Sequence, residues 1–223
     1  MNRYMFRAAI GAYFHVDTNI VRTWLPNGLV PLEARPGHAI LAVTSFDFIN
    51  SEVGPYGEVV LSILVPPFAS RGVELPHAAT FPIVLMTTTE ASAAHNGERW
   101  YLPGFERPVK IDLTQADNRR ILRVTDEGKP LLTLSVQRNH GAPSSRLFQV
   151  FTTNKGVVHR ANVRFIGDLD EHQNETGHLE IFSHPLTDRF SPALLDDLPI
   201  VEQSMNAGEE QYADVVPHFA EPK

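Results

Sequence analysis

The sequence predicts a mainly β fold (β-rich α+β) whose strands form a closed or strongly curved antiparallel sheet. Short apolar and β-branched segments recur along the chain, each bounded by Gly, Pro, Asn or Asp, as in strands joined by turns. The 17 prolines agree with many short strands. At 223 residues and 43% hydrophobic side chains, the chain suffices for one large domain, or at most two small ones.

The first expected strand covers residues 4–14, where aromatic and apolar residues nearly alternate. A long strand is expected at 38–49. The remaining expected strands are 59–65, 81–87, 119–124, 131–136, 147–153, 157–165 and 179–182.

Three helices are expected between these strands. Asp17 is a suitable N-cap for a first helix that ends near Leu25, before a Pro-Asn-Gly turn. A second helix covers 90–96 and ends at Gly97. A third lies within 192–197. The polar segment 168–177 is expected to form a hairpin loop.

Composition limits the classes of partner. The net charge of −7 argues against non-specific binding to nucleic acid or to an anionic membrane. No apolar run reaches the length of a membrane helix or of a signal peptide. The absence of cysteine excludes disulfides and thiolate chemistry. We therefore expect a cytoplasmic protein without a nucleic-acid or membrane partner.

The common cofactor and metal motifs are absent from the sequence. The glycines form neither a dinucleotide-binding nor a phosphate-binding loop, and no Gly-x-Ser-x-Gly nucleophile elbow is present. Ten histidines are present, but none forms His-x-x-x-His or His-x-His. We therefore expect no cofactor and no metal.

Two charged residues stand within expected strands and are candidate catalytic residues. Glu58 opens an apolar run and is interpreted either as a solvated strand end or as a cavity carboxyl with a raised pKa. Arg7 is interpreted either as an edge-strand charge or as a guanidinium that binds a carboxylate.

Several motifs resemble the acetoacetate decarboxylase family. In the run 90–105, Glu98, Trp100 and Pro103 match that family's Gly-Arg-Glu-x-Trp-Gly-Tyr-Pro-Lys-Lys pattern. Further matches, in the family's order, are the segments 24–29, 54–58, 195–202 and 213–214. The resemblance implies a single domain over 1–223 that forms a cone-like antiparallel β-barrel with peripheral helices and a cavity inside the barrel. It also implies a homo-oligomer.

The resemblance fails at the residue that the family's reaction requires. A family lysine forms a Schiff base with a β-keto acid, but Gly104 and Phe105 stand at the two lysine positions. The chain's lysines are Lys110, Lys129, Lys155 and Lys223, and of these Lys110 is the candidate for an alternative Schiff base.

Two functions from different classes follow. The first is an enzyme in which Glu58 is the acid–base residue and Arg7 binds a carboxylate or enolate oxygen. It would catalyse an isomerisation, dehydration, cyclisation or non-imine C–C lyase reaction on an oxo acid or polyketide-like molecule of secondary metabolism. The second is a small-molecule-binding protein without turnover. The expected cavity wall contains Phe14, Tyr56, Trp100, Gly104 and Phe105.

Overall fold

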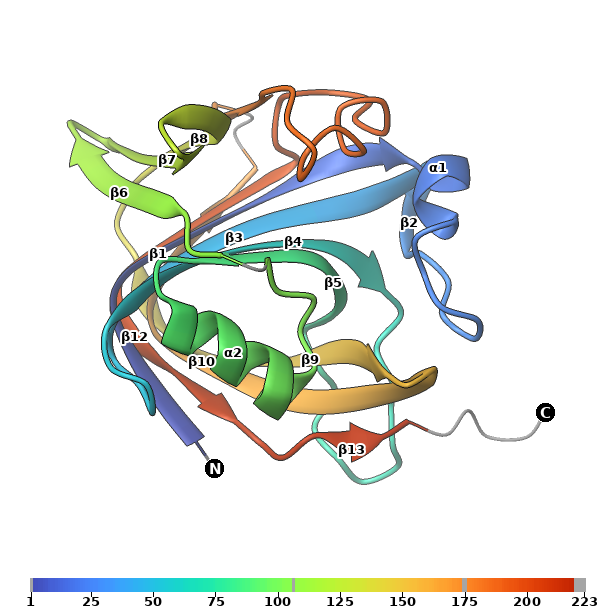
Figure 1. Cartoon of the computed structure of the whole chain (residues 1–223). Coiled ribbons are helices and arrows are strands. Elements are labelled where there is room, and N and C mark those ends of the chain that lie inside the picture. Colours follow the sequence, from blue (N-terminus) through green and yellow to red (C-terminus); the bar gives the residue numbers. More distant parts are fainter. Residues whose placement is uncertain (1, 106, 174–175, 219–223) are drawn as a thin grey trace.

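The computed structural model describes residues 2–105, 107–173 and 176–218, and its central feature is a closed barrel (Figure 1). β3 pairs with β1 and closes the ring. Neighbouring barrel strands are antiparallel, apart from β5 and β9, which pair in parallel over a short stretch. In order around the barrel, the strands are β1 (Asn2–Asp17), β12 (Val201–Tyr212), β10 (Val157–His172), β9 (Ala142–Asn154), β5 (Ala78–Thr87), β4 (Tyr56–Val65) and β3 (His38–Asn50).

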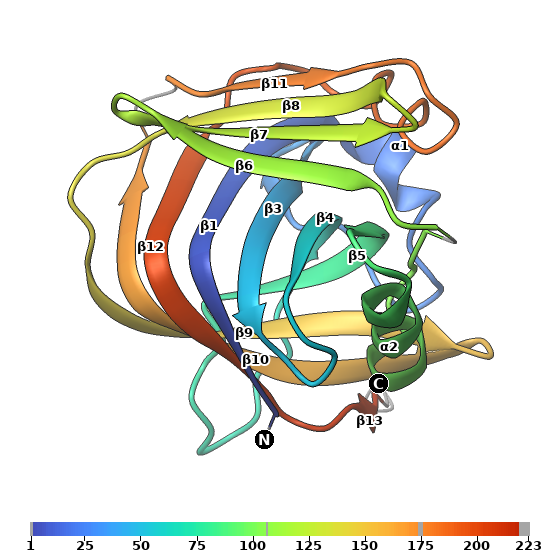
Figure 2. The ribbon, with the colours of Figure 1, turned by 60° about the vertical axis from the view of Figure 1, so that its left-hand side comes forward.

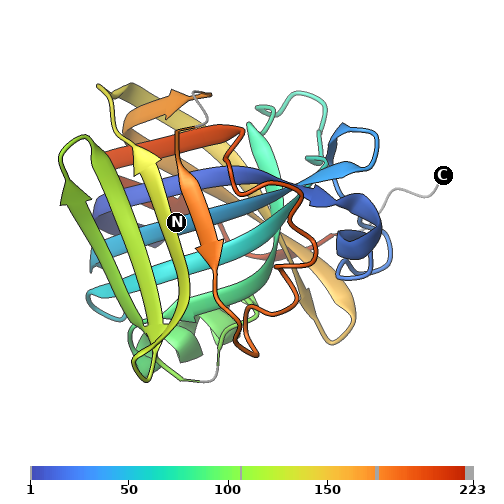
Figure 3. The same ribbon diagram turned by 90° about the horizontal axis from the view of Figure 1, so that it is seen from above.

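A second, four-stranded sheet lies across the outside of the barrel (Figures 2 and 3). Its order is β11 (His178–Ile181), β8 (Lys129–Gln137), β7 (Arg119–Asp126) and β6 (Lys110–Ala116). The largest core lies between the two sheets, where Leu41 and Leu61 of the barrel cluster with Leu122 and Leu134. The short strands β2 (Glu33–Arg35) and β13 (Val216–Pro217) pair with β3 and β10. The β-rich prediction is confirmed.

The two helices follow their sequence signals in part. α1 (Thr18–Arg22) begins at Asp17, whose carboxylate accepts hydrogen bonds from the backbone N–H groups of Asn19 and Ile20. α2 (Glu90–Trp100) continues through Gly97 and ends at Tyr101, which has a left-handed backbone. The prediction that this helix ends at Gly97 is therefore wrong. No helix in the described residues is long and apolar enough to cross a membrane.

Two predictions in the C-terminal half are also wrong. The segment 192–197 is not helical, because it is tied to β1: Asp17 donates its N–H to Ala193, and Leu195 donates to His15. The expected loop 168–177 is strand up to His172, since β10 continues to pair with β12. Residues 174 and 175 of that loop lie outside the described residues.

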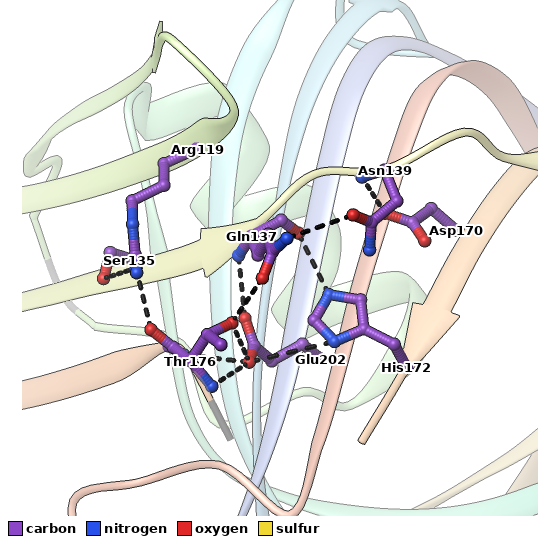
Figure 4. A network of polar contacts seen from close by, with 9 residues as sticks. Arg119, Ser135, Gln137, Asn139, Asp170, His172, Thr176 and Glu202 are labelled. Atoms are coloured by element: carbon purple, nitrogen blue, oxygen red, sulfur yellow. Dashed lines mark hydrogen bonds and ion pairs between the residues drawn. The ribbon is translucent and has the colours of Figure 1, made fainter. Parts of the chain in front are cut away.

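A buried carboxylate joins the barrel to the second sheet (Figure 4). Glu202 of β12 is fully buried and accepts the backbone N–H of Gln137 at 2.7 Å. It also accepts the backbone N–H groups of Thr176 and Gly177, each at 2.8 Å. A side chain at Gly177 would meet the Ser135 carbonyl at 2.6 Å, so this close approach requires glycine. The C-terminal motif residue Glu202 is thus a structural anchor.

Candidate active site

A cavity of about 120 Å³ lies inside the barrel, and its wall is mainly apolar. Aromatic and aliphatic side chains from most of the barrel strands form this wall, among them Phe46, Val60, Phe148, Phe165 and Met205. The charged side chains of the wall, within the described part of the chain, are Glu58, Arg146 and Glu210. An apolar cavity with a few convergent polar groups is typical of a small-molecule site.

Glu58 lies on β4 and points into the barrel, where it is 3% exposed. Its Oε2 accepts hydrogen bonds from the Tyr56 hydroxyl at 3.2 Å and from Asn96 Nδ2 of α2 at 2.8 Å. Burial raises the pKa of Glu58 to about 7, against the lowering effect of these two hydrogen bonds. Both protonation states are therefore accessible near neutral pH, as acid–base chemistry requires.

A second carboxyl lies in the same cavity. Glu210 of β12 is 1% exposed, and its Oε2 has no hydrogen-bond partner. Burial, followed by the charge of Glu58, raises the pKa of Glu210 well above its ordinary value. Two buried carboxyls with this mutual effect favour a state in which at least one carries a proton. Glu210 was not predicted from the sequence, because its strand is polar and has no apolar alternation.

Two further aromatic residues line the same cavity as Glu58 and Glu210. Trp100, at the end of α2, lines the cavity and packs on the Tyr212 ring, with ring centroids 4.7 Å apart. Tyr212 also lines the cavity, and burial, followed by the charge of Glu210, raises the pKa of its hydroxyl well above the ordinary value. Tyr56 donates its hydroxyl hydrogen bond to Glu58 but does not itself line the cavity. Its position corrects the expectation that it lines the cavity directly.

Two expected site residues on β1 lie elsewhere, and one β-bulge explains both. Phe6 pairs with Phe48 and Ala8 with Asp47, so Arg7 is an extra residue in the strand. The Arg7 side chain is 69% exposed and pairs with Asp47. After the bulge the alternation is reversed, and Phe14 points outward into the core beneath the second sheet. The prediction that Arg7 and Glu58 face one cavity is wrong.

The segment after α2 also departs from expectation. Gly104 is exposed and forms a bridge with Leu85, while Phe105 packs against the outer core. Leu102 of this segment does line the cavity. Its backbone N–H bonds to the Asn96 carbonyl at 3.2 Å, which turns the chain back toward the barrel. Gly104 and Phe105 are therefore not wall residues.

No lysine lines the cavity among the residues that the structure describes. Lys110 is 72% exposed and forms an ion pair with Asp112 at 2.8 Å. Lys129 and Lys155 are exposed residues next to or within turns of the second sheet and the barrel. Lys223 lies outside the described residues. Likewise, no group of three or more His, Asp or Glu side chains in the described residues could hold a metal ion.

Glu58 is expected to make the stability of the fold depend on pH. Its folded pKa of about 7 lies above the ordinary value of 4.5, so its stabilising effect is complete below pH 4.5 and is lost as the pH rises to about 7. The free energy of unfolding should fall by roughly 3 kcal/mol over that range relative to Glu58→Gln, which cannot ionise. Urea denaturation of both proteins across this range measures the difference, and parallel curves would contradict it.

No protein-family model and no curated protein matches the sequence. The structure, in contrast, matches solved proteins over nearly its whole length. It aligns over 98% of this chain and 88% of the acetoacetate decarboxylase from Legionella pneumophila subsp. pneumophila str. Philadelphia 1, with a TM-score of 0.69 and 15% identity. This chain has the acetoacetate decarboxylase fold.

Other solved proteins with different names share this fold. The enduracididine biosynthesis enzyme MppR, in complex with the condensation product of pyruvate and imidazole 4-carboxaldehyde, aligns with 97% of this chain and 89% of its own, at a TM-score of 0.65 and 13% identity. An acetoacetate decarboxylase-like enzyme from Sphingomonas wittichii RW1 aligns over 97% and 92%, at a TM-score of 0.60 and 17% identity. The acetoacetate decarboxylase fold by itself therefore does not specify one reaction.

Proposed function

We propose that this protein is an enzyme that transfers a proton at a carbon atom next to the carbonyl group of an oxo acid or polyketide-like molecule. The observation that carries the proposal is the buried Glu58 carboxyl, whose pKa of about 7 is suited to proton transfer at neutral pH. The adjacent Glu210 offers a second carboxyl with an unpartnered oxygen.

The roles of the two carboxyls follow from their surroundings. Glu58, as carboxylate, accepts the α-proton, and the electron pair of the broken C–H bond moves into the new carbon–carbon double bond. The substrate oxygen becomes an enolate, which accepts a hydrogen bond from protonated Glu210 or from the Tyr212 hydroxyl. Burial raises the pKa values of both groups, which favours the protonated forms that can donate. Return of a proton from Glu58 to carbon completes the cycle, and exchange with solvent occurs when Glu58 trades its proton with water before that return.

An enolate formed in this way opens several reactions that need no imine. Reprotonation at another carbon gives an isomerisation, loss of a β-hydroxyl gives a dehydration, and attack on a second carbonyl gives a cyclisation or, in reverse, a C–C lyase reaction. Because no described lysine lines the cavity, Schiff-base decarboxylation is not part of this proposal. The biosynthetic role of MppR, which has the same fold, supports a place in secondary metabolism.

The proposal is tested by proton exchange in deuterated buffer. Acetoacetate, longer oxo acids and aryl methyl ketones are incubated with the protein, and loss of the α-proton signal is followed by NMR. We expect catalysed exchange whose rate rises with pH through an inflection near pH 7, since Glu58 must be ionised to act as base. Borohydride treatment of the same mixtures should give no covalent adduct in the intact mass. Binding without exchange would instead support a non-catalytic binding protein.

Two further properties belong to this proposal. We propose a homo-oligomer, which light scattering of the purified protein would test. We also propose a cytoplasmic location, which fractionation of the source cells would test. The sequence features given above support both, and a monomer or a secreted protein would contradict them.

A further inference from the structure

The cavity contains one cationic side chain among the described residues, and it lies apart from the acid pair. Arg146 of β9 lines the wall and is 26% exposed, so it lies near solvent. Its Nη1 donates to Glu171 Oε2 at 2.5 Å and to His77 Nε2 at 3.1 Å. Gln203 Nε2 donates to the same Glu171 oxygen at 2.5 Å, which holds the carboxylate in place.

One edge of the Arg146 guanidinium remains available. Nε and Nη2 make no hydrogen bond to any residue that the structure describes, whereas Nη1 already has two partners. The Nε and Nη2 atoms form the side of the fork that binds a carboxylate through two parallel hydrogen bonds. The ion pair with Glu171 thus orients the guanidinium without using the edge that suits an anion.

The strand register gives the α-carbon separation between Arg146 and Glu210. Arg146 pairs with Phe165 of β10, and Phe165 pairs with Glu210 of β12, three adjacent strands in Figure 2. Arg146 and Glu210 are therefore two strand spacings apart, roughly 10 Å between α-carbons. The Phe165 side chain lines the cavity between them, and the nearby wall is apolar.

Electrostatics sets the orientation of an anionic ligand in this cavity. A carboxylate beside Glu58 and Glu210 would lose its water and would meet the negative charge of Glu58 whenever that carboxyl is ionised, which is unfavourable. A carboxylate beside Arg146 would meet an opposite charge and stay close to solvent. The carbonyl group, which is uncharged, is the part of the substrate that can enter the acid end.

We propose that Arg146 binds the carboxylate of an elongated oxo acid, whose apolar body fills the middle of the cavity and whose carbonyl lies at Glu58 and Glu210. This inference rests on the proposed function for the role of the acid end. It specifies the substrate class as an acid with an apolar chain or ring between carboxylate and ketone. On this proposal, short oxo acids such as acetoacetate are expected to bind less well, because they have no apolar body between the carboxylate and the ketone.

The test uses two probes of the same shape. 4-Acetylbenzoate has a carboxylate, an aromatic ring and exchangeable methyl-ketone protons, and 4-acetylbenzamide lacks only the charge. Calorimetry gives the Kd of each probe, and NMR exchange gives kcat and KM. We expect the wild type to bind the carboxylate about 10- to 100-fold more tightly than the amide. Arg146→Met should abolish that preference and leave amide binding within about threefold.

Matched variants separate recognition from a general loss of charge. Arg164 of β10 is also 26% exposed and pairs with Glu74 at 2.5 Å, but it does not line the cavity. Arg164→Met should therefore keep the preference. Glu171→Gln removes the charge that opposes the ligand and should tighten carboxylate binding several-fold. Arg146→Lys keeps the charge but not the fork and should retain only part of the preference.

Probe binding tests the role of Arg146, whereas proton exchange tests the proposed reaction at Glu58 and Glu210. A wild type that does not bind 4-acetylbenzoate, or an Arg146→Met variant that keeps the preference, overturns the inference. Exchange of the amide in either case would leave the proposed proton transfer intact. Conversely, Arg146-dependent binding without exchange of either probe supports the inference at Arg146 and contradicts the proposed reaction.

Discussion

Glu58→Gln is expected to lower kcat for α-proton exchange at least 100-fold, which is the usual effect of removing a positioned general base. Glutamine has nearly the same shape, and its oxygen can still accept the hydrogen bonds of Tyr56 and Asn96, so the cavity should persist. It cannot accept the substrate's proton, because an amide is not basic at neutral pH. Ligand binding by calorimetry should change less than about threefold, which would separate loss of chemistry from loss of the site.

The pH profile gives this prediction a second readout. Residual exchange in Glu58→Gln should lack the inflection near pH 7 that the Glu58 carboxyl gives to the wild type. Glu180→Gln, an exposed change on β11, is the control and should match the wild type in rate and profile. Wild-type activity in Glu58→Gln would show that another group moves the proton, with Glu210 the first to examine.

Glu202→Ala is expected to lower the free energy of unfolding by about 4 kcal/mol, the range measured when one partner of a buried charged contact is removed. The substitution leaves the N–H groups of Gln137, Thr176 and Gly177 without their acceptor. It also leaves a space at the point where β12 of the barrel meets β8 of the second sheet. Chemical denaturation monitored by tryptophan fluorescence measures the loss.

Another glutamate of β12 supplies the control for this change. Glu209 lies on the same β12 strand and pairs with Arg3; the Arg3 side chain is 65% exposed and that of Glu209 is 16% exposed, so the pair is open to solvent on the arginine side. Glu209→Ala should cost less than about 1 kcal/mol, because exposed ion pairs contribute little. A loss in Glu202→Ala no greater than that in Glu209→Ala would show that the Glu202 network does not hold the two sheets together.

Local sequence signals predicted the strands with apolar alternation and the cap at Asp17, but they missed β12 and β6. The β12 sequence 201–212 contains Glu, Gln, Asn and Gly at many positions, which lowers its intrinsic strand preference. It forms a strand because it lies between β1 and β10 and pairs with both. The buried Glu202 is held by partners distant in sequence, and Glu210 lines a cavity that distant strands enclose, so neither could be recognised from local pattern.

The sequence by itself determined the β-rich class, the resemblance to the acetoacetate decarboxylase fold and the absence of cysteine chemistry, and it named Glu58 as a candidate acid. These properties follow from the composition and from the order of residues along the chain. Only the tertiary structure decided which side chains meet in the cavity. One bulge at Arg7 reverses the face of β1, and closure of the barrel brings Glu58, Glu210 and Arg146 into one wall. These contacts depend on the register between strands that are distant in sequence, and local sequence signals do not contain that register.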